Sequence, residues 1–193
     1  MIYLLPILAY LVGSVSSAIL VARALGLEDP RNVGSKNPGA TNILRYGGRL
    51  AAVLTLLGDV LKGIVPVTLA HLLTHSPGIL AATALAAFIG HLYPLFFGFK
   101  GGKGVATALG VWTAINPWIG LLLILTWAVT AAITRYSSLS GLVAAALAPI
   151  YVAWLMPSWA YVSVMFIISG LLFYRHWPNI QRLRAGEEAK IGS

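Results

Sequence analysis

The chain has 193 residues, of which 59% are hydrophobic and 9% are charged, and its net charge is +8. Because soluble domains carry about 25% charged residues, this composition excludes an ordinary water-soluble fold and indicates a protein whose main solvent is lipid. The sequence contains no cysteine, which excludes disulfides, thiolate catalysis and cysteine-ligated metal sites.

Apolar segments follow one another along the whole chain and predict an all-α membrane protein with about seven transmembrane helices in a single domain, residues 1–193. The fourth segment is short, since a helix of about 13 residues rises only about 20 Å and the hydrocarbon layer is about 30 Å thick. Two crossings are still expected over 105–134, because one long helix would leave Arg135 on the outer face. The predicted spans are 2–22, 51–73, 79–97, 105–117, 118–134, 141–156 and 159–174.

Lysine and arginine occur at only one set of the predicted helix ends. Because these residues are retained on the cytoplasmic side, the pattern predicts an outside N-terminus and a cytoplasmic C-terminus. The same retention accounts for the net positive charge, so a nucleic-acid partner is not expected. The basic connections are 23–50, 98–104 and 175–190, whereas the turns around 71–78, 116–118 and 156–159 contain no lysine or arginine.

The first cytoplasmic connection contains the run GSKNPGATN over 34–42, followed by Arg45. Glycine N–H groups, the side chains of Ser35 and Asn42, and the Arg45 charge form a donor set that suits oxyanions. Gly39 belongs to the same run. The alternative is a loop that is rich in turn formers and helix caps.

The second basic connection, GFKGGKG over 98–104, leads directly into the apolar segment that begins at Val105. Glycines allow a phosphate to approach the N–H groups and the positive dipole end of the following helix closely. A nucleotide-hydrolysing P-loop is disfavoured, because Phe97 replaces its first glycine and Gly104 replaces its magnesium-binding Ser or Thr. The alternative is a flexible, positively charged turn. The candidate residues are Gly101, Gly102, Lys103 and Gly104.

Two ionisable residues, Asp59 and Lys62, lie inside the second predicted helix. A spacing of three places them on one face, and charges in a membrane segment face a partner or a cavity. A structural ion pair and direct participation in chemistry both remain open. His91, near the inner end of the third helix, is expected to be a buried structural histidine.

The last basic stretch begins with Arg175-His176-Trp177-Pro178-Asn179 and continues to Glu188. His176 is a candidate base and Asn179 a candidate orienting group, while the alternative is a juxtamembrane tail with snorkelling arginines. Ser137 lies in a short polar run at the start of the sixth helix. The sequence contains no G-x-S-x-G or H-E-x-x-H motif and no His followed five positions later by Asp, so classical esterase and metalloprotease chemistry is excluded, and no metal is expected.

Taken together, these segments resemble the bacterial acyl-phosphate:glycerol-3-phosphate acyltransferases. The segments are GSKNPGATNILR (34–45), DVLKG (59–63), GHLYPLFFGFKGGKGVATALGV (90–111), RYSSLS (135–140) and RHWPNIQRLRAGEE (175–188). The resemblance implies transfer of a fatty acyl group from acyl phosphate to the 1-hydroxyl of glycerol 3-phosphate. The products would be lysophosphatidic acid and phosphate, in the first step of phospholipid synthesis. It also implies a bacterial inner-membrane protein that contacts membrane lipid, has a cytoplasmic active site and needs no cofactor.

The resemblance also implies a role for each candidate residue. The catalytic residues are expected to be Ser35, Lys103, His176 and Asn179. The substrate-binding residues are expected to be Arg45, Gly39, Asn42, Gly101, Gly102 and Gly104. Supporting roles are expected for Asp59, Lys62, His91, Ser137 and Glu188.

The group that takes the hydroxyl proton is left open by the sequence. Either His176 accepts it or the donor's own phosphate does, and the second route is favoured because the segments contain more anion-binding donors than bases. An acyl-Ser35 intermediate is a third route, but Ser35 has no evident neighbouring base. The rival functions are a small anion transporter or channel and a membrane scaffold.

Overall fold

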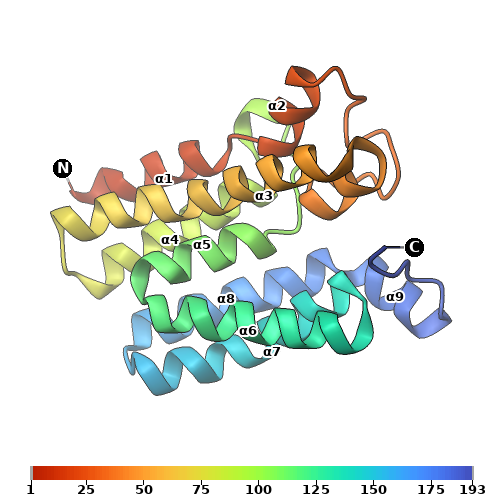
Figure 1. Ribbon diagram of the computed structural model, residues 1–193. Helices are drawn as coiled ribbons and strands as arrows, with labels where there is room; N and C mark the ends of the chain where they lie inside the picture. The colour runs from red at the N-terminus through yellow and green to blue at the C-terminus, as the bar shows by residue number, and fades with distance from the viewer. Residues whose placement is uncertain (1, 193) are drawn as a thin grey trace. The chain divides into compact units, whose positions relative to one another are not determined.

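The computed structural model describes residues 2–192, and over this range all of the regular secondary structure is helical (Figure 1). Two short 3₁₀ helices, η1 (Ile2–Leu4) and η2 (Leu95–Phe97), accompany the α-helices. The α-helices are α1 (Leu5–Gly13), α2 (Ser17–Ala24), α3 (Ala40–Leu73), α4 (Pro77–Leu92), α5 (Val105–Ile115), α6 (Pro117–Thr134), α7 (Ser137–Leu155), α8 (Trp159–Arg175) and α9 (Trp177–Ala185).

Every predicted apolar segment coincides with helical structure, and the all-helical class is confirmed over the described residues. Within residues 2–192, five helical stretches are long and apolar enough to cross a membrane, whereas α5 and α8 are shorter apolar helices. Seven crossings and the orientation of the termini therefore stay predictions. The five long stretches are Ile2–Ala24, Ala40–Leu73, Pro77–Phe97, Pro117–Thr134 and Ser137–Leu155.

The surface of α3 shows which solvent surrounds the helices. Its exposed side includes Leu57, Leu61, Val65 and Leu69, which recur every four residues and are each between 45% and 54% exposed. A water-soluble helix would present polar residues on that side. Here the outward stripe is apolar, as expected for a helix that faces lipid.

Polar residues and glycines interrupt the long apolar stretches. The first span is not the continuous helix expected over 2–22, because α1 ends at Gly13 and α2 begins at Ser17. Helix α3 has a kink at Gly48, whose φ of 80° lies in the left-handed region. Asn116 ends α5 and caps α6, since its side chain accepts a hydrogen bond from the N–H of Trp118 at 2.9 Å. The prediction of two helices over 105–134 is therefore confirmed.

The chain divides into two compact units, Met1–Ile115 and Asn116–Ser193, called here the N-terminal and C-terminal units. In the N-terminal unit, α1 packs against α4 and α3 packs against α5 (Figure 1). A Cβ on Gly63 would collide with α5 backbone at Thr107, and one on Gly110 would collide with α3 backbone at Val60. Such small residues bring membrane helices into close contact. In the C-terminal unit, α7 packs against both α6 and α8.

Candidate active site

The first loop, residues 34–42, is held in place by Asn42, which lies in the opening turn of α3. The Asn42 side chain accepts a hydrogen bond from the N–H of Ser35 and donates to the carbonyls of Pro30 and Val33, each at 3.0 Å. Asn42 is 1% exposed, and a Cβ on Gly34 would collide with its amide oxygen. The amide of Asn42 therefore holds the loop together, and Ser35 lies exposed at the surface.

Gly39 is the N-cap residue of α3, and its carbonyl accepts hydrogen bonds from the N–H groups of Asn42 at 3.0 Å and Ile43 at 3.1 Å. The helical stretch from Ala40 to the kink at Gly48 carries Arg45 as an exposed side chain. The sequence-predicted residues Ser35, Gly39, Asn42 and Arg45 thus belong to one folded loop and the short helical stretch that follows it.

The glycine-lysine loop, residues 98–104, is held tightly against α4. The N–H of Gly102 donates to the carbonyl of His91 at 3.3 Å. A Cβ on Gly102 would collide with Nε2 of His91 and would lie 3.0 Å from the carbonyl oxygen of Pro38 in the first loop. A side chain at this position would therefore require the imidazole of His91 to move.

The end of the same loop is equally restricted. Gly104 has a φ of +94°, and a Cβ there would collide with the ring of Phe88. Gly101 and Gly104 are buried and Lys103 is partly buried. Helix α5 begins directly afterwards at Val105, as predicted. The loop thus leads into a helix N-terminus, where backbone N–H groups and the helix dipole favour an anion.

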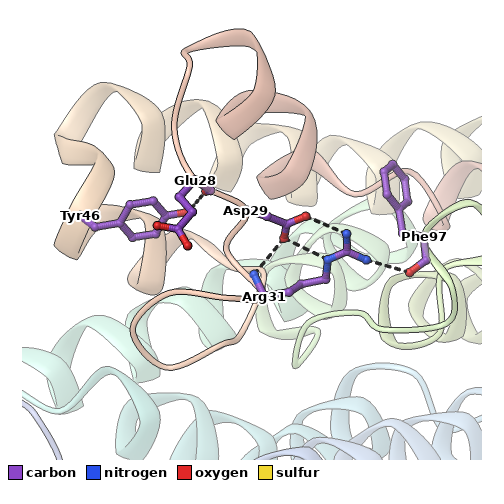
Figure 2. Close-up of polar contacts among 5 residues, drawn as sticks. All are labelled: Glu28, Asp29, Arg31, Tyr46 and Phe97. Atoms are coloured by element: carbon purple, nitrogen blue, oxygen red, sulfur yellow. Dashed lines mark hydrogen bonds and ion pairs between the residues drawn. The ribbon is translucent and has the colours of Figure 1, made fainter.

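The segment before the first loop contains contacts that the sequence did not suggest (Figure 2). The Arg31 side chain donates to both carboxylate oxygens of Asp29, at 2.9 and 2.7 Å, and to the carbonyl of Phe97 at 3.1 Å. The hydroxyl of Tyr46 donates to the carbonyl of Glu28 at 2.9 Å. The hydrogen bond from Arg31 holds the pKa of Asp29 below its usual value, so this pair is ionised at neutral pH.

A buried charged cluster lies beneath the glycine-lysine loop. Nζ of Lys62 is 2.8 Å from Oδ1 of Asp59 and also donates to the carbonyl of Val15 at 2.8 Å. Nδ1 of His91 lies 3.6 Å from the same Asp59 oxygen, and Thr107 donates to the Asp59 carbonyl at 2.9 Å. Asp59 and Lys62 thus form the ion pair that was one of the two alternatives left open by the sequence, and His91 is buried, as expected.

In the C-terminal unit, Glu188 follows α9 and contacts residues of two helices, α7 and α9. Its carboxylate accepts hydrogen bonds from Ser138 and Asn179, each at 2.6 Å, and from Arg182 at 2.7 Å. Burial raises the pKa of Glu188, but these three donors outweigh it and leave the pKa below its usual value. The sequence singled out Ser137, whereas its neighbour Ser138 makes the contact with Glu188. Ser138 and Arg182 are thus residues that sequence reasoning missed.

His176 lies at the junction between α8 and α9 and is 3% exposed. Its Nδ1 is 2.8 Å from the carbonyl oxygen of Leu172. A carbonyl oxygen can only accept, so this hydrogen bond requires a proton on Nδ1, and in the neutral ring Nε2 is then the nitrogen with a lone pair. Asn179, one helical turn further on, is 4% exposed. The predicted pair His176 and Asn179 therefore shares the first turn of α9.

Each unit thus contains its own polar cluster. The N-terminal unit contains the first loop, the helical stretch that carries Arg45, and the glycine-lysine loop. The C-terminal unit contains His176, Asn179 and Glu188. Residues 2–192 contain no group of three or more histidine and carboxylate side chains placed to hold a metal ion. The chemistry available is anion binding by backbone, lysine and arginine, with one histidine as a candidate base.

Comparison with known proteins gives one consistent result. The sequence model of the family described as glycerol-3-phosphate acyltransferase matches residues 3–186. The chain is 57% identical to the glycerol-3-phosphate acyltransferase of Thioalkalivibrio sulfidiphilus, with 96% of this chain and 91% of that protein covered. It is also 57% identical to that of Methylococcus capsulatus, with 99% and 96% covered.

Two solved structures are similar over nearly the whole chain. Both are crystal structures of PlsY (YgiH), an integral membrane glycerol 3-phosphate acyltransferase. The glycerol 3-phosphate form has a TM-score of 0.93 and 40% sequence identity and covers 99% of this chain and 96% of that chain. The lysophosphatidic acid form has a TM-score of 0.91 and 38% identity and covers 99% and 95%.

Proposed function

The chain belongs to the glycerol-3-phosphate acyltransferase family, and we propose that its acyl donor is acyl phosphate. The chain is a membrane acyltransferase that acts on glycerol 3-phosphate. In the proposed reaction the 1-hydroxyl oxygen attacks the carbonyl carbon of acyl phosphate, the bond from that carbon to the phosphate oxygen breaks, and lysophosphatidic acid and inorganic phosphate leave. We place this reaction at the cytoplasmic face of a bacterial inner membrane, where the basic loops are expected.

The observation that supports this proposal best is the glycine-lysine loop at the start of α5. Both substrates carry a phosphate, and the loop combines a helix N-terminus, tightly packed glycines and Lys103. Arg45, on the exposed stretch before the Gly48 kink, supplies a second cation. We assign Lys103 and Arg45 to phosphate neutralisation, with backbone N–H groups around Gly101 and Gly104 as further donors.

Ser35 keeps the catalytic role expected from the sequence, whereas Asn42 receives a different one. Ser35 is exposed and free of helical structure, so its hydroxyl is assigned to the oxyanion that develops on the acyl carbonyl. The Asn42 amide is occupied by Ser35, Pro30 and Val33. We therefore propose that Asn42 positions Ser35 rather than binding substrate.

For the C-terminal unit, we assign His176 and Asn179 to orientation of the acceptor and its hydroxyl. Glu188 supports this arrangement, because its carboxylate accepts a hydrogen bond from Asn179 at 2.6 Å. The leaving phosphate is the proposed proton acceptor, which leaves His176 to orient and polarise. In that route the hydroxyl proton is transferred to a phosphate oxygen as the new ester bond forms.

The donor is tested by supplying purified protein with glycerol 3-phosphate and, in separate reactions, palmitoyl phosphate, palmitoyl-CoA or palmitoyl-acyl carrier protein. Lysophosphatidic acid and phosphate are expected only from palmitoyl phosphate. Product from either thioester with none from palmitoyl phosphate would overturn the donor assignment. Uptake of glycerol 3-phosphate into sealed vesicles without product would instead favour the anion-transporter alternative.

The proton route is tested with His176→Gln, which keeps a hydrogen-bonding side chain and removes the base. A reduced but measurable rate with retained binding of both substrates is expected if the phosphate takes the proton. Complete loss of chemistry with normal binding would assign the proton to His176. Acylated protein trapped in a quenched reaction would favour an acyl-Ser35 intermediate.

A further inference from the structure

We propose that Arg31 is a positioning residue for acyl transfer, because its guanidinium ties the segment before the first loop to the beginning of the glycine-lysine loop. The segment 28–31, called here the brace, makes contacts on both of its sides (Figure 2). The inference rests on the proposed function to the extent that both of these loops bind substrate phosphates.

One side of the brace is the Arg31 fork. Nε and Nη2 donate to the two carboxylate oxygens of Asp29, and the backbone N–H of Arg31 also donates to Asp29 at 2.9 Å. This arrangement fixes the guanidinium plane and aims Nη1 at the carbonyl of Phe97, 3.1 Å away. Asp29 therefore orients Arg31, and Arg31 reaches a part of the chain that is 66 positions distant in sequence.

The carbonyl of Phe97 lies at the point where the glycine-lysine loop begins. Gly98 and Phe99 both have left-handed backbone, with φ values of 66° and 59°. The N–H of Phe99 donates to the carbonyl of Pro94 at 3.0 Å and closes the turn. Consecutive left-handed residues are unusual. The hydrogen bond from Arg31 to the Phe97 carbonyl helps to hold this backbone conformation, and with it the course of the loop toward Lys103.

The other side of the brace contacts the stretch that carries Arg45. The next residue, Tyr46, donates its hydroxyl to the carbonyl of Glu28 at 2.9 Å, and the Tyr46 side chain packs against the small core formed by α2 and the start of α3. The brace is thus bonded to the residue after Arg45 on one side and to the residue before Gly98 on the other. It sets the separation between the two proposed phosphate-binding segments.

The contacts of the brace are poorly suited to a purely structural role. The side chains of Arg31 and Asp29 are 27% and 26% exposed, and ion pairs that water reaches contribute little to global stability. Placement matters more to catalysis, since a misplacement of about 1 Å reduces rates on the order of 100-fold. Loss of the brace is therefore expected to change kinetics far more than the unfolding temperature.

The kinetic test compares Arg31→Gln, Arg31→Lys and Asp29→Asn, with Arg49→Gln as the control at an exposed arginine outside the brace. For Arg31→Gln we expect kcat/KM to fall about 10- to 100-fold with a rise in KM for glycerol 3-phosphate and an unfolding temperature near wild type. Arg31→Lys should fail to restore activity, because an ammonium cannot bridge Asp29 and Phe97 as a fork. Recovery in Arg31→Lys would overturn the proposal, because charge alone would then suffice.

Loop separation is measured independently with spin labels. The chain has no cysteine, so Lys36→Cys and Lys100→Cys label one exposed position in each loop. Adding Arg31→Gln should broaden the label-to-label distance distribution, and adding Arg49→Gln should not. An unchanged distribution overturns the proposal whatever the kinetics show, and so does a broadened one with wild-type kinetics. If wild-type protein makes no product from palmitoyl phosphate, the donor assignment fails, whereas the distance measurement still tests the brace.

Discussion

Replacing Lys62 by methionine removes one member of a buried ion pair while keeping most of the side-chain volume. Asp59 is 3% exposed and Lys62 is 7% exposed, and the charged atoms are 2.8 Å apart. At an effective dielectric constant of about 20, their direct attraction is about 6 kcal/mol. Breaking such a pair by removing one partner typically destabilises a protein by about 3–5 kcal/mol. We expect Lys62→Met to lower the free energy of unfolding by about 3–5 kcal/mol.

A double-mutant cycle of Asp59 and Lys62 tests this expectation. Asp59→Asn combined with Lys62→Met removes both charges, so neither is left unpaired among apolar side chains. The double variant should therefore be destabilised by about 2 kcal/mol less than the sum of the two single variants. Unfolding in mixed detergent micelles, followed by tryptophan fluorescence, measures all four proteins under the same conditions.

The matched control is Leu61→Met, at a neighbouring α3 position that is 51% exposed. That change should shift the free energy of unfolding by less than about 0.5 kcal/mol. A cost below about 1 kcal/mol for Lys62→Met, or strict additivity in the double variant, would refute the argument from an uncompensated buried charge.

Three further predictions concern the two polar clusters. Gly102→Ala should abolish most activity because its Cβ collides with His91, whereas Gly170→Ala, which has open space around it, should leave activity unchanged. Because the Glu188 pKa is lowered, the stability it contributes is present above the ordinary glutamate pKa and lost as pH falls through the lowered one. Glu188→Gln should remove that acid dependence of the thermal unfolding temperature and cost about 1.5–3 kcal/mol at pH 7. Asn42→Asp replaces a donor to two carbonyls by an anion, and its kcat should fall at least tenfold while the circular dichroism spectrum stays helical.

The helices could be predicted because their ends are marked locally. Asn116, Pro117 and Arg135 interrupt apolar runs, and the structure ends or begins helices within a few residues of each. The break between α1 and α2 was missed, since its serines are small and its surroundings remain apolar. Helix α9 was not predicted, because the pattern after Arg175 is polar and has no apolar stripe of the usual kind.

The site was predictable in composition but not in its internal contacts. Donor-rich segments can be recognised in the sequence, but their contacts cannot. One hydrogen-bond partner of Glu188, for example, is Ser138, which is 50 positions away. Asn42 illustrates the same limit, because sequence shows an amide in an anion-binding loop but not that the loop itself occupies the amide. In the sequence, Arg31 resembles the other arginines of the basic connections, and only the fold brings Phe97 to its guanidinium.

The gap between α1 and α2 has a consequence for how the chain enters the bilayer. A broken helix leaves backbone carbonyls without intrahelical donors, and lipid offers none in their place. Here the carbonyl of Val15 receives its hydrogen bond from Lys62, 47 positions later in the chain. We therefore expect the first hydrophobic stretch to reach its final conformation only after α3 has entered the bilayer, so that insertion of the two stretches is coupled.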